Sequence, residues 1–96
     1  MPWFAFIGHD GPEGATRRSQ HRPAHLAGLE ALESDGRIRH AGPLIGDDGM
    51  PLGSLILFEA ADLDEARAIA ARDPYVTEGV FARYEVRQTK VVFPRR

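Results

Sequence analysis

The chain has 96 residues, the length of one domain, and we expect residues 1–96 to fold as a single unit. Hydrophobic residues make up 43% of the sequence and charged residues 27%, which is typical of globular proteins and excludes disordered or collagen-like chains. The 12 basic and 14 acidic side chains give a net charge of −2, so no overall positive field would attract nucleic acid or an anionic membrane.

The absence of cysteine excludes disulfides and thiolate catalysis and fits a reducing cytoplasm. No stretch reaches the roughly 18 consecutive apolar residues that a membrane-spanning helix needs. Residues 1–8 are too short and too weakly charged to resemble a signal peptide. We therefore expect a cytoplasmic protein whose partners include neither nucleic acid nor membrane.

Four strands and two helices are predicted along the chain. In order, they are a strand at 3–7, a helix that begins between 16 and 23 and ends at 35, strands at 38–44 and 54–58, a helix from 62 to 72 or 73, and a strand at 81–93 that is broken near 88. Gly36 is expected to end the first helix, because glycine readily adopts the left-handed backbone conformation that follows many helices. Pro23 either opens that helix or kinks a longer one. Asp62 and Glu65 have the spacing of a capping box, and Pro74 disfavours helical geometry in the residue before it.

This order, β-α-β-β-α-β, is typical of the ferredoxin-like α+β fold, a four-stranded antiparallel sheet with both helices on one face. The strands at 3–7 and 54–58 are apolar at nearly every position, whereas a sheet that is wet on one side alternates apolar with polar residues. Short strands can be apolar by chance. Otherwise a second copy must cover the open face, which predicts a homodimer that packs sheet against sheet.

A titratable histidine lies within the buried stripe of the first predicted helix. At 100° per residue, His25 shares one face with Leu29 and Leu32, and Arg22 and His21 lie on that face one turn earlier. The stripe that faces the sheet therefore begins polar and becomes apolar.

The second predicted helix carries an acidic residue on its inner face. That face comprises Leu63, Ala66, Ile69, Ala70 and Asp73. At a helix C-terminus the carboxylate of Asp73 faces the negative end of the dipole and needs a cationic or hydrogen-bonding partner. Because the two helices run antiparallel, the start of the first lies beside the end of the second, which makes a pair with His25 plausible. The same edge of the sheet receives His9, Gly42, Pro43, Gly53, Ser54 and Tyr75.

A histidine whose tautomer is fixed by a carboxylate can exchange protons near neutral pH. In this hypothesis Asp73 orients His25, which acts as general base or acid in a pocket between helices and sheet. Arg22 would dock an anionic group, and Tyr75 or Ser54 would donate hydrogen bonds. The alternative is a core histidine that is satisfied by a carbonyl group.

A metal site is the other interpretation of the helical histidines. His21 and His25 have the i, i+4 spacing of paired metal ligands, but no glutamate follows His21, and Pro23 lies between them. The sequence also lacks a Walker loop, a dinucleotide-binding glycine pattern and a serine nucleophile motif. We therefore expect neither a metal nor a cofactor.

Several segments together resemble the YciI-like (YCII-related) family of small dimeric α+β-barrel proteins. They are "RPAHLAGLEAL", "AGPL", "GSLILFEA", "DPYVTEGVF" and "KVVF", and they cover almost the whole chain. The resemblance implies a ferredoxin-like fold and an active site built on His25 and Asp73. It also implies roles for residues on matching motif positions, which are Arg22, Gly42, Pro43, Pro74 and Tyr75. The activity associated with the family is dehydrochlorination of a chlorinated hydroxyhydroquinone.

The sequence thus favours a small homodimeric enzyme of the lyase type, in which His25 moves a proton on an unidentified small molecule, aromatic or anionic. The alternative is a non-catalytic module of the same fold that binds a small molecule without transforming it. A pure scaffold is the third hypothesis, and it predicts no concave polar pocket.

Overall fold

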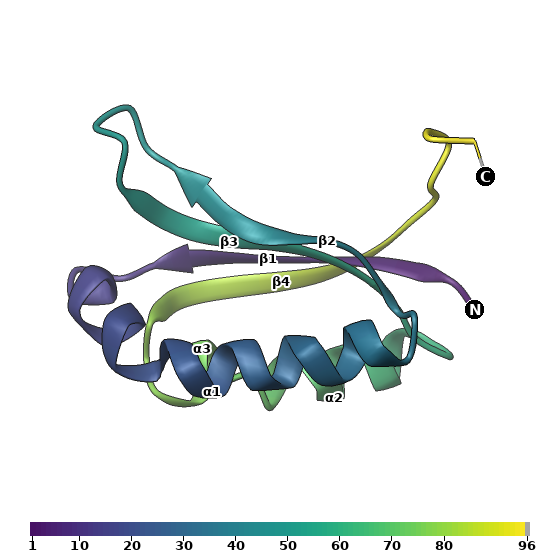
Figure 1. Cartoon of the computed structure of the whole chain (residues 1–96), viewed down its shortest axis with the longest axis horizontal. Coiled ribbons are helices and arrows are strands. Elements are labelled where there is room, and N and C mark those ends of the chain that lie inside the picture. The colour runs from purple at the N-terminus through teal and green to yellow at the C-terminus, as the bar shows by residue number, and fades with distance from the viewer. Residues whose placement is uncertain (96) are drawn as a thin grey trace.

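The computed structural model describes residues 1–95, which form a four-stranded sheet and three helices (Figure 1). The elements are β1 (Trp3–Asp10), α1 (Gly14–Ser34), β2 (Ile38–Ile45), β3 (Pro51–Glu59), α2 (Leu63–Ala71), α3 (Pro74–Thr77) and β4 (Phe81–Thr89). The sheet is antiparallel throughout, in the order β2-β3-β1-β4. The predicted β-α-β-β-α-β order and the ferredoxin-like α+β fold are confirmed, with α3 as an addition.

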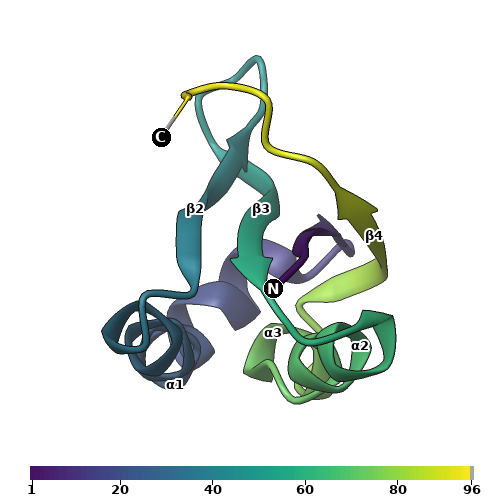
Figure 2. The same ribbon diagram turned by 90° about the vertical axis from the view of Figure 1, so that its right-hand side faces the viewer.

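All three helices lie on one face of the sheet, as Figures 1 and 2 show from two directions. Alternate residues of the two central strands point toward them, and they pair across the strands as Phe4 with Phe58 and Phe6 with Ile56. These four side chains are at most 2% exposed and form the centre of the core. None of the helices within residues 1–95 is long and apolar enough to cross a membrane.

The helix α1 begins earlier than the periodicity predicted, at Gly14, and Pro23 lies inside it. Arg17 and Arg18 stabilise this additional start through ion pairs with Glu13 and Asp10, which a search for apolar periodicity does not detect. The end agrees with the prediction, since Asp35 caps α1 and is followed by Gly36 with a φ angle of 72°.

Two predicted boundaries near the C-terminus were wrong. The helix α2 ends at Ala71, one residue before the earlier of its two predicted ends, and residues 74–77, for which no helix was predicted, form the short helix α3. The last strand ends at Thr89 and does not continue to Phe93. Residues 90–93 instead border a hollow of about 280 Å³ on the face of the sheet opposite the helices.

This second face is apolar in its middle, on the two central strands. Ala5 and Ile7 of β1 pair with Leu57 and Leu55 of β3, and all four side chains are partly exposed. No helix of the described residues covers them, as Figure 2 shows. The apolar runs of β1 and β3 therefore do form two apolar faces, of which the chain itself covers one.

Candidate active site

A cavity of about 420 Å³ lies between α1 and the strands β2 and β3. The helix α1 lines it with Ala15, Arg18, Ser19, Arg22, His25, Leu26 and Leu29, which recur every three or four residues and so share one face. The sheet contributes Ala41, Gly42 and Pro43 of β2 and Pro51, Ser54 and Ile56 of β3. Met50 and Tyr75 complete the lining.

His25 is buried at the side of this cavity and contacts Asp73 across the two helical segments. Its Nδ1 atom lies 2.8 Å from Oδ1 and 3.0 Å from Oδ2 of Asp73, although 48 positions separate the residues in sequence. The side chains are 8% and 9% exposed. Within residues 1–95 every buried side-chain nitrogen or oxygen has a hydrogen-bond partner, so the unbonded Nε2 atom of His25 must be accessible. The imidazole thus has one nitrogen held by a carboxylate and one free for a ligand.

Asp73 reaches this position because the chain changes direction at the following residue. Pro74 disfavours helical geometry in the residue before it, and Asp73 has an extended backbone with ψ of 129°. Its Oδ1 atom also accepts the backbone N–H of Tyr75 at 2.8 Å and thereby caps α3. As predicted, Asp73 directly follows the C-cap of α2, and its backbone N–H donates to the carbonyl of Ala70. It is also the N-cap of α3, a role that the sequence did not predict.

Tyr75 fixes the plane of the imidazole. Its ring stacks on His25 with the centroids 3.8 Å apart and the planes 6° from parallel, and the residue is 2% exposed. Its hydroxyl donates a 3.4 Å hydrogen bond to the carbonyl of Arg18. Burial raises the pKa of the Tyr75 phenol above its ordinary value of 10.0, so the phenol is neutral at physiological pH. The ring therefore supports His25 as an uncharged surface.

Arg18 is the residue of the site that the sequence interpretation missed. Its guanidinium forms an ion pair with Asp10 through Nε at 2.6 Å and Nη2 at 3.0 Å. Nη2 also donates to the carbonyl of Gly53 at 2.6 Å and to Oγ of Ser54 at 2.9 Å. The guanidinium carbon lies 4.9 Å from the centroid of the Tyr75 ring. Arg18 thus packs against the Tyr75 ring and ties α1 to the ends of β1 and β3.

Six of the predicted site residues line the cavity. They are Arg22, His25, Gly42, Pro43, Ser54 and Tyr75. Asp73 does not line it but holds His25 from behind. His9 lies on the opposite face of the sheet from the cavity, because the inward-facing positions of β1 are Phe4, Phe6 and Gly8. Across residues 1–95, no three histidine, aspartate or glutamate side chains gather in a way that could hold a metal ion.

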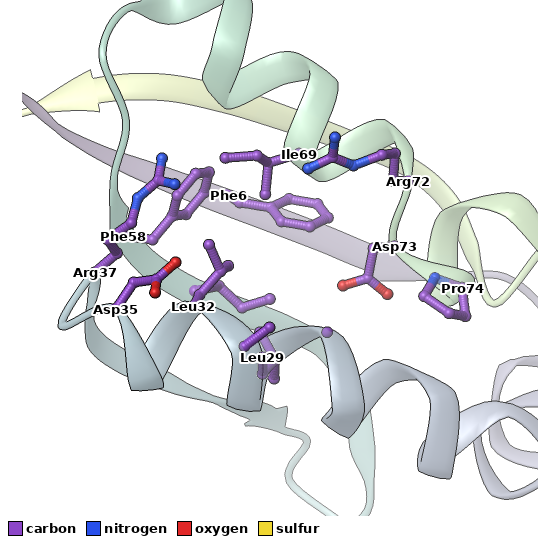
Figure 3. A pocket seen from close by; sticks show the side chains of 13 residues that line it. Phe6, Leu29, Leu32, Asp35, Arg37, Phe58, Ile69, Arg72, Asp73 and Pro74 are labelled. Carbon is purple, nitrogen blue, oxygen red and sulfur yellow. The ribbon is translucent and has the colours of Figure 1, made fainter.

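Asp73 also borders a second, mostly apolar cavity of about 270 Å³ between α1 and α2. Figure 3 shows its carboxylate pointing from the segment between α2 and α3 toward α1, with Phe6, Leu32 and Ile69 beyond it. Leu29 lines both cavities, as does Ile56. The His25 to Asp73 contact therefore stands between the two cavities.

Comparison with known proteins agrees with this fold. The model of the YCII-related domain matches residues 2–90. The chain therefore belongs to the YCII-related family. It is 34% identical to protein YciI of Escherichia coli O6:H1 over 96 residues, which covers 94% of this chain and 98% of that protein. It is also 34% identical to an uncharacterised protein of Haemophilus influenzae over 97 residues, covering 95% of this chain and 99% of that one.

Among solved structures, the chain is similar to a 5-chloro-2-hydroxyhydroquinone dehydrochlorinase, TftG, from Burkholderia phenoliruptrix. That structure is a complex with 2,5-dihydroxybenzoquinone. The TM-score is 0.82 and the identity 32%, over 92% of this chain and 93% of the dehydrochlorinase. The chain thus has the fold of a dehydrochlorinase of known structure.

Proposed function

We propose that this protein is a lyase-type enzyme in which His25, oriented by Asp73, moves a proton on a small molecule bound in the cavity. The observation that carries the proposal is the buried contact between Nδ1 of His25 and Asp73, combined with an accessible Nε2. A carboxylate at Nδ1 holds the proton there and leaves a lone pair on Nε2, which is the arrangement that a general base needs.

The geometry suits an elimination that releases hydrogen chloride. Nε2 of His25 takes a proton from the substrate, and the electrons of the broken bond to hydrogen form a new double bond. The bond between carbon and chlorine breaks, and chloride leaves with its electron pair. Asp73 stabilises the imidazolium ion that forms, and the stack with Tyr75 keeps the imidazole in place. The similarity to TftG supports this reaction type over other proton transfers.

The direct test is release of chloride from 5-chloro-2-hydroxyhydroquinone by the purified protein. We expect release that is proportional to enzyme concentration and exceeds the spontaneous rate. Binding of the compound without chloride release would favour the alternative function, a module that binds a small molecule and leaves it unchanged. No binding would argue against this substrate class.

We further propose that two copies pack through the open face of the sheet, as the apolar pairs between Ala5 and Leu57 and between Ile7 and Leu55 suggest. These pairs lie on the central strands, and no helix of the described residues covers them. Packing two such faces together removes apolar surface from water on both copies.

The cytoplasmic location that the sequence predicts stays a prediction.

Introducing a charge in the middle of that face should separate the copies. We expect Leu57→Glu to run as a monomer in analytical ultracentrifugation, because dimer formation would bury an unpaired carboxylate. The matched control is Ala27→Glu, which adds the same charge on the exposed side of α1 and should leave the dimer intact. A monomeric wild-type protein would contradict the proposal.

A further inference from the structure

We infer that the end of the cavity near Arg18 and Arg22 is a binding subsite for the anionic group of a single-ring ligand, a carboxylate or an ionised ring hydroxyl. The inference deepens the proposed function, because the anion is then part of the molecule on which His25 acts. It can nevertheless be tested by binding alone.

The first observation is that hydrogen-bond donors at this end are unused. The Nη1 atom of Arg18 makes no hydrogen bond among residues 1–95, although its Nε and Nη2 atoms make four. It must be accessible, since no buried nitrogen or oxygen of these residues lacks a partner. Ser54 accepts a hydrogen bond from Arg18 but donates to no described residue, so its hydroxyl proton is also available.

The second observation is the charge of the lining. Arg22 is exposed at the cavity and forms no ion pair or hydrogen bond with the described residues. Among residues 1–95, no aspartate or glutamate lines the cavity. Asp10, which lies outside the cavity lining, neutralises much of the charge of Arg18. The carboxylate of Asp73 contacts His25. The cavity therefore offers donors and one unbalanced positive charge, and an anionic acceptor complements both.

The third observation is that one of the donors, Arg18, is held in place before a ligand arrives. The side chain of Arg18 is 12% exposed and is fixed by Asp10, Gly53 and Ser54. Little conformational entropy is lost when a fixed donor receives an anion, which strengthens binding.

The position of the subsite sets the size of the ligand. Arg18 and His25 are seven residues apart on α1, or about 10 Å along its axis, with Arg22 between them. The volume of about 420 Å³ lies near the small end of the range for ligand pockets. Beyond His25 the lining becomes apolar, with Leu26, Leu29 and Ile56. A ligand with one ring fits this cavity, with an anionic substituent at the arginine end and the ring against the apolar residues.

Benzoate and its neutral analogue benzamide test the subsite. We expect the wild-type protein to bind benzoate about tenfold more tightly than benzamide in isothermal titration calorimetry, the ratio that one charge-assisted hydrogen bond provides. Arg22→Gln should bring the ratio close to one by weakening benzoate alone, and Ser54→Ala should lower it in the same direction. Arg67→Gln is the matched control, because it removes the same charge from an exposed position on α2.

Equal binding of the two compounds, no benzoate binding at millimolar concentration, or an unchanged ratio in Arg22→Gln would overturn the inference. His25→Asn separates this inference from the proposed function. It should still prefer benzoate, even if chloride release is never observed. Loss of the preference in His25→Asn would place the anion on the imidazole and would also overturn the inference.

Discussion

Replacing His25 with asparagine is expected to lower the rate of chloride release by about two to four orders of magnitude, the contribution of a positioned general base. The asparagine amide can still donate to Asp73, so the buried carboxylate keeps a partner. The loss should therefore appear in kcat, measured with 5-chloro-2-hydroxyhydroquinone, while the circular dichroism spectrum and benzoate binding remain those of the wild type.

Asp73→Asn tests the orienting role with little disturbance of the fold. Asparagine caps helices about as well as aspartate, so α3 should keep its N-cap to Tyr75. Without the carboxylate the imidazole loses its charged partner, and turnover should fall, by less than in His25→Asn. Wild-type turnover in either variant would show that this contact is only structural.

The second large effect concerns stability. Asp10→Asn is expected to lower the free energy of unfolding by about 3 kcal/mol, because it leaves the partly buried guanidinium of Arg18 without its counter-charge. The two side chains are 8% and 12% exposed, so water screens little of this loss. Urea denaturation followed by circular dichroism measures the change.

Two further variants show whether the loss arises from the ion pair. Glu13→Gln breaks the neighbouring pair with Arg17, whose side chains are 72% and 42% exposed, and should cost about 1 kcal/mol or less. The double variant Asp10→Asn/Arg18→Gln removes both buried charges and should regain part of the stability. If Asp10→Asn lowers the free energy of unfolding no more than Glu13→Gln does, the pair between Asp10 and Arg18 contributes no more stability than an exposed ion pair.

The fold was predictable because the helix caps and the apolar runs in the sequence indicated the same order of elements. The cap that Asp62 was expected to provide is present, and the backbone N–H of Glu65 donates to its Oδ1 atom at 2.8 Å. The apolar runs at the two central strands form the pair at the middle of the sheet. The short helix α3 was missed, because four residues are too few for a helical period to appear.

The contact between His25 and Asp73 was predictable from helix faces and topology together. The Arg18 network was not, since the predicted start of α1 lay between residues 16 and 23 and left the helical face of Arg18 undefined. Once α1 begins at Gly14, Arg18 precedes Arg22 by one turn and lies on the same stripe. Asp10 lay outside the strand predicted at 3–7, although it is the last residue of β1.

One carboxylate in this fold serves two purposes that selection would act on separately. Asp73 both initiates α3 and holds the imidazole, so a descendant that lost its chemistry would still need an aspartate or a similar cap at this position. Among the described residues, the histidine side chain makes no comparable hydrogen bond to the backbone, so helix capping does not constrain which residue stands there. Under the proposed function, the histidine is therefore the more informative marker of catalysis in relatives with divergent functions.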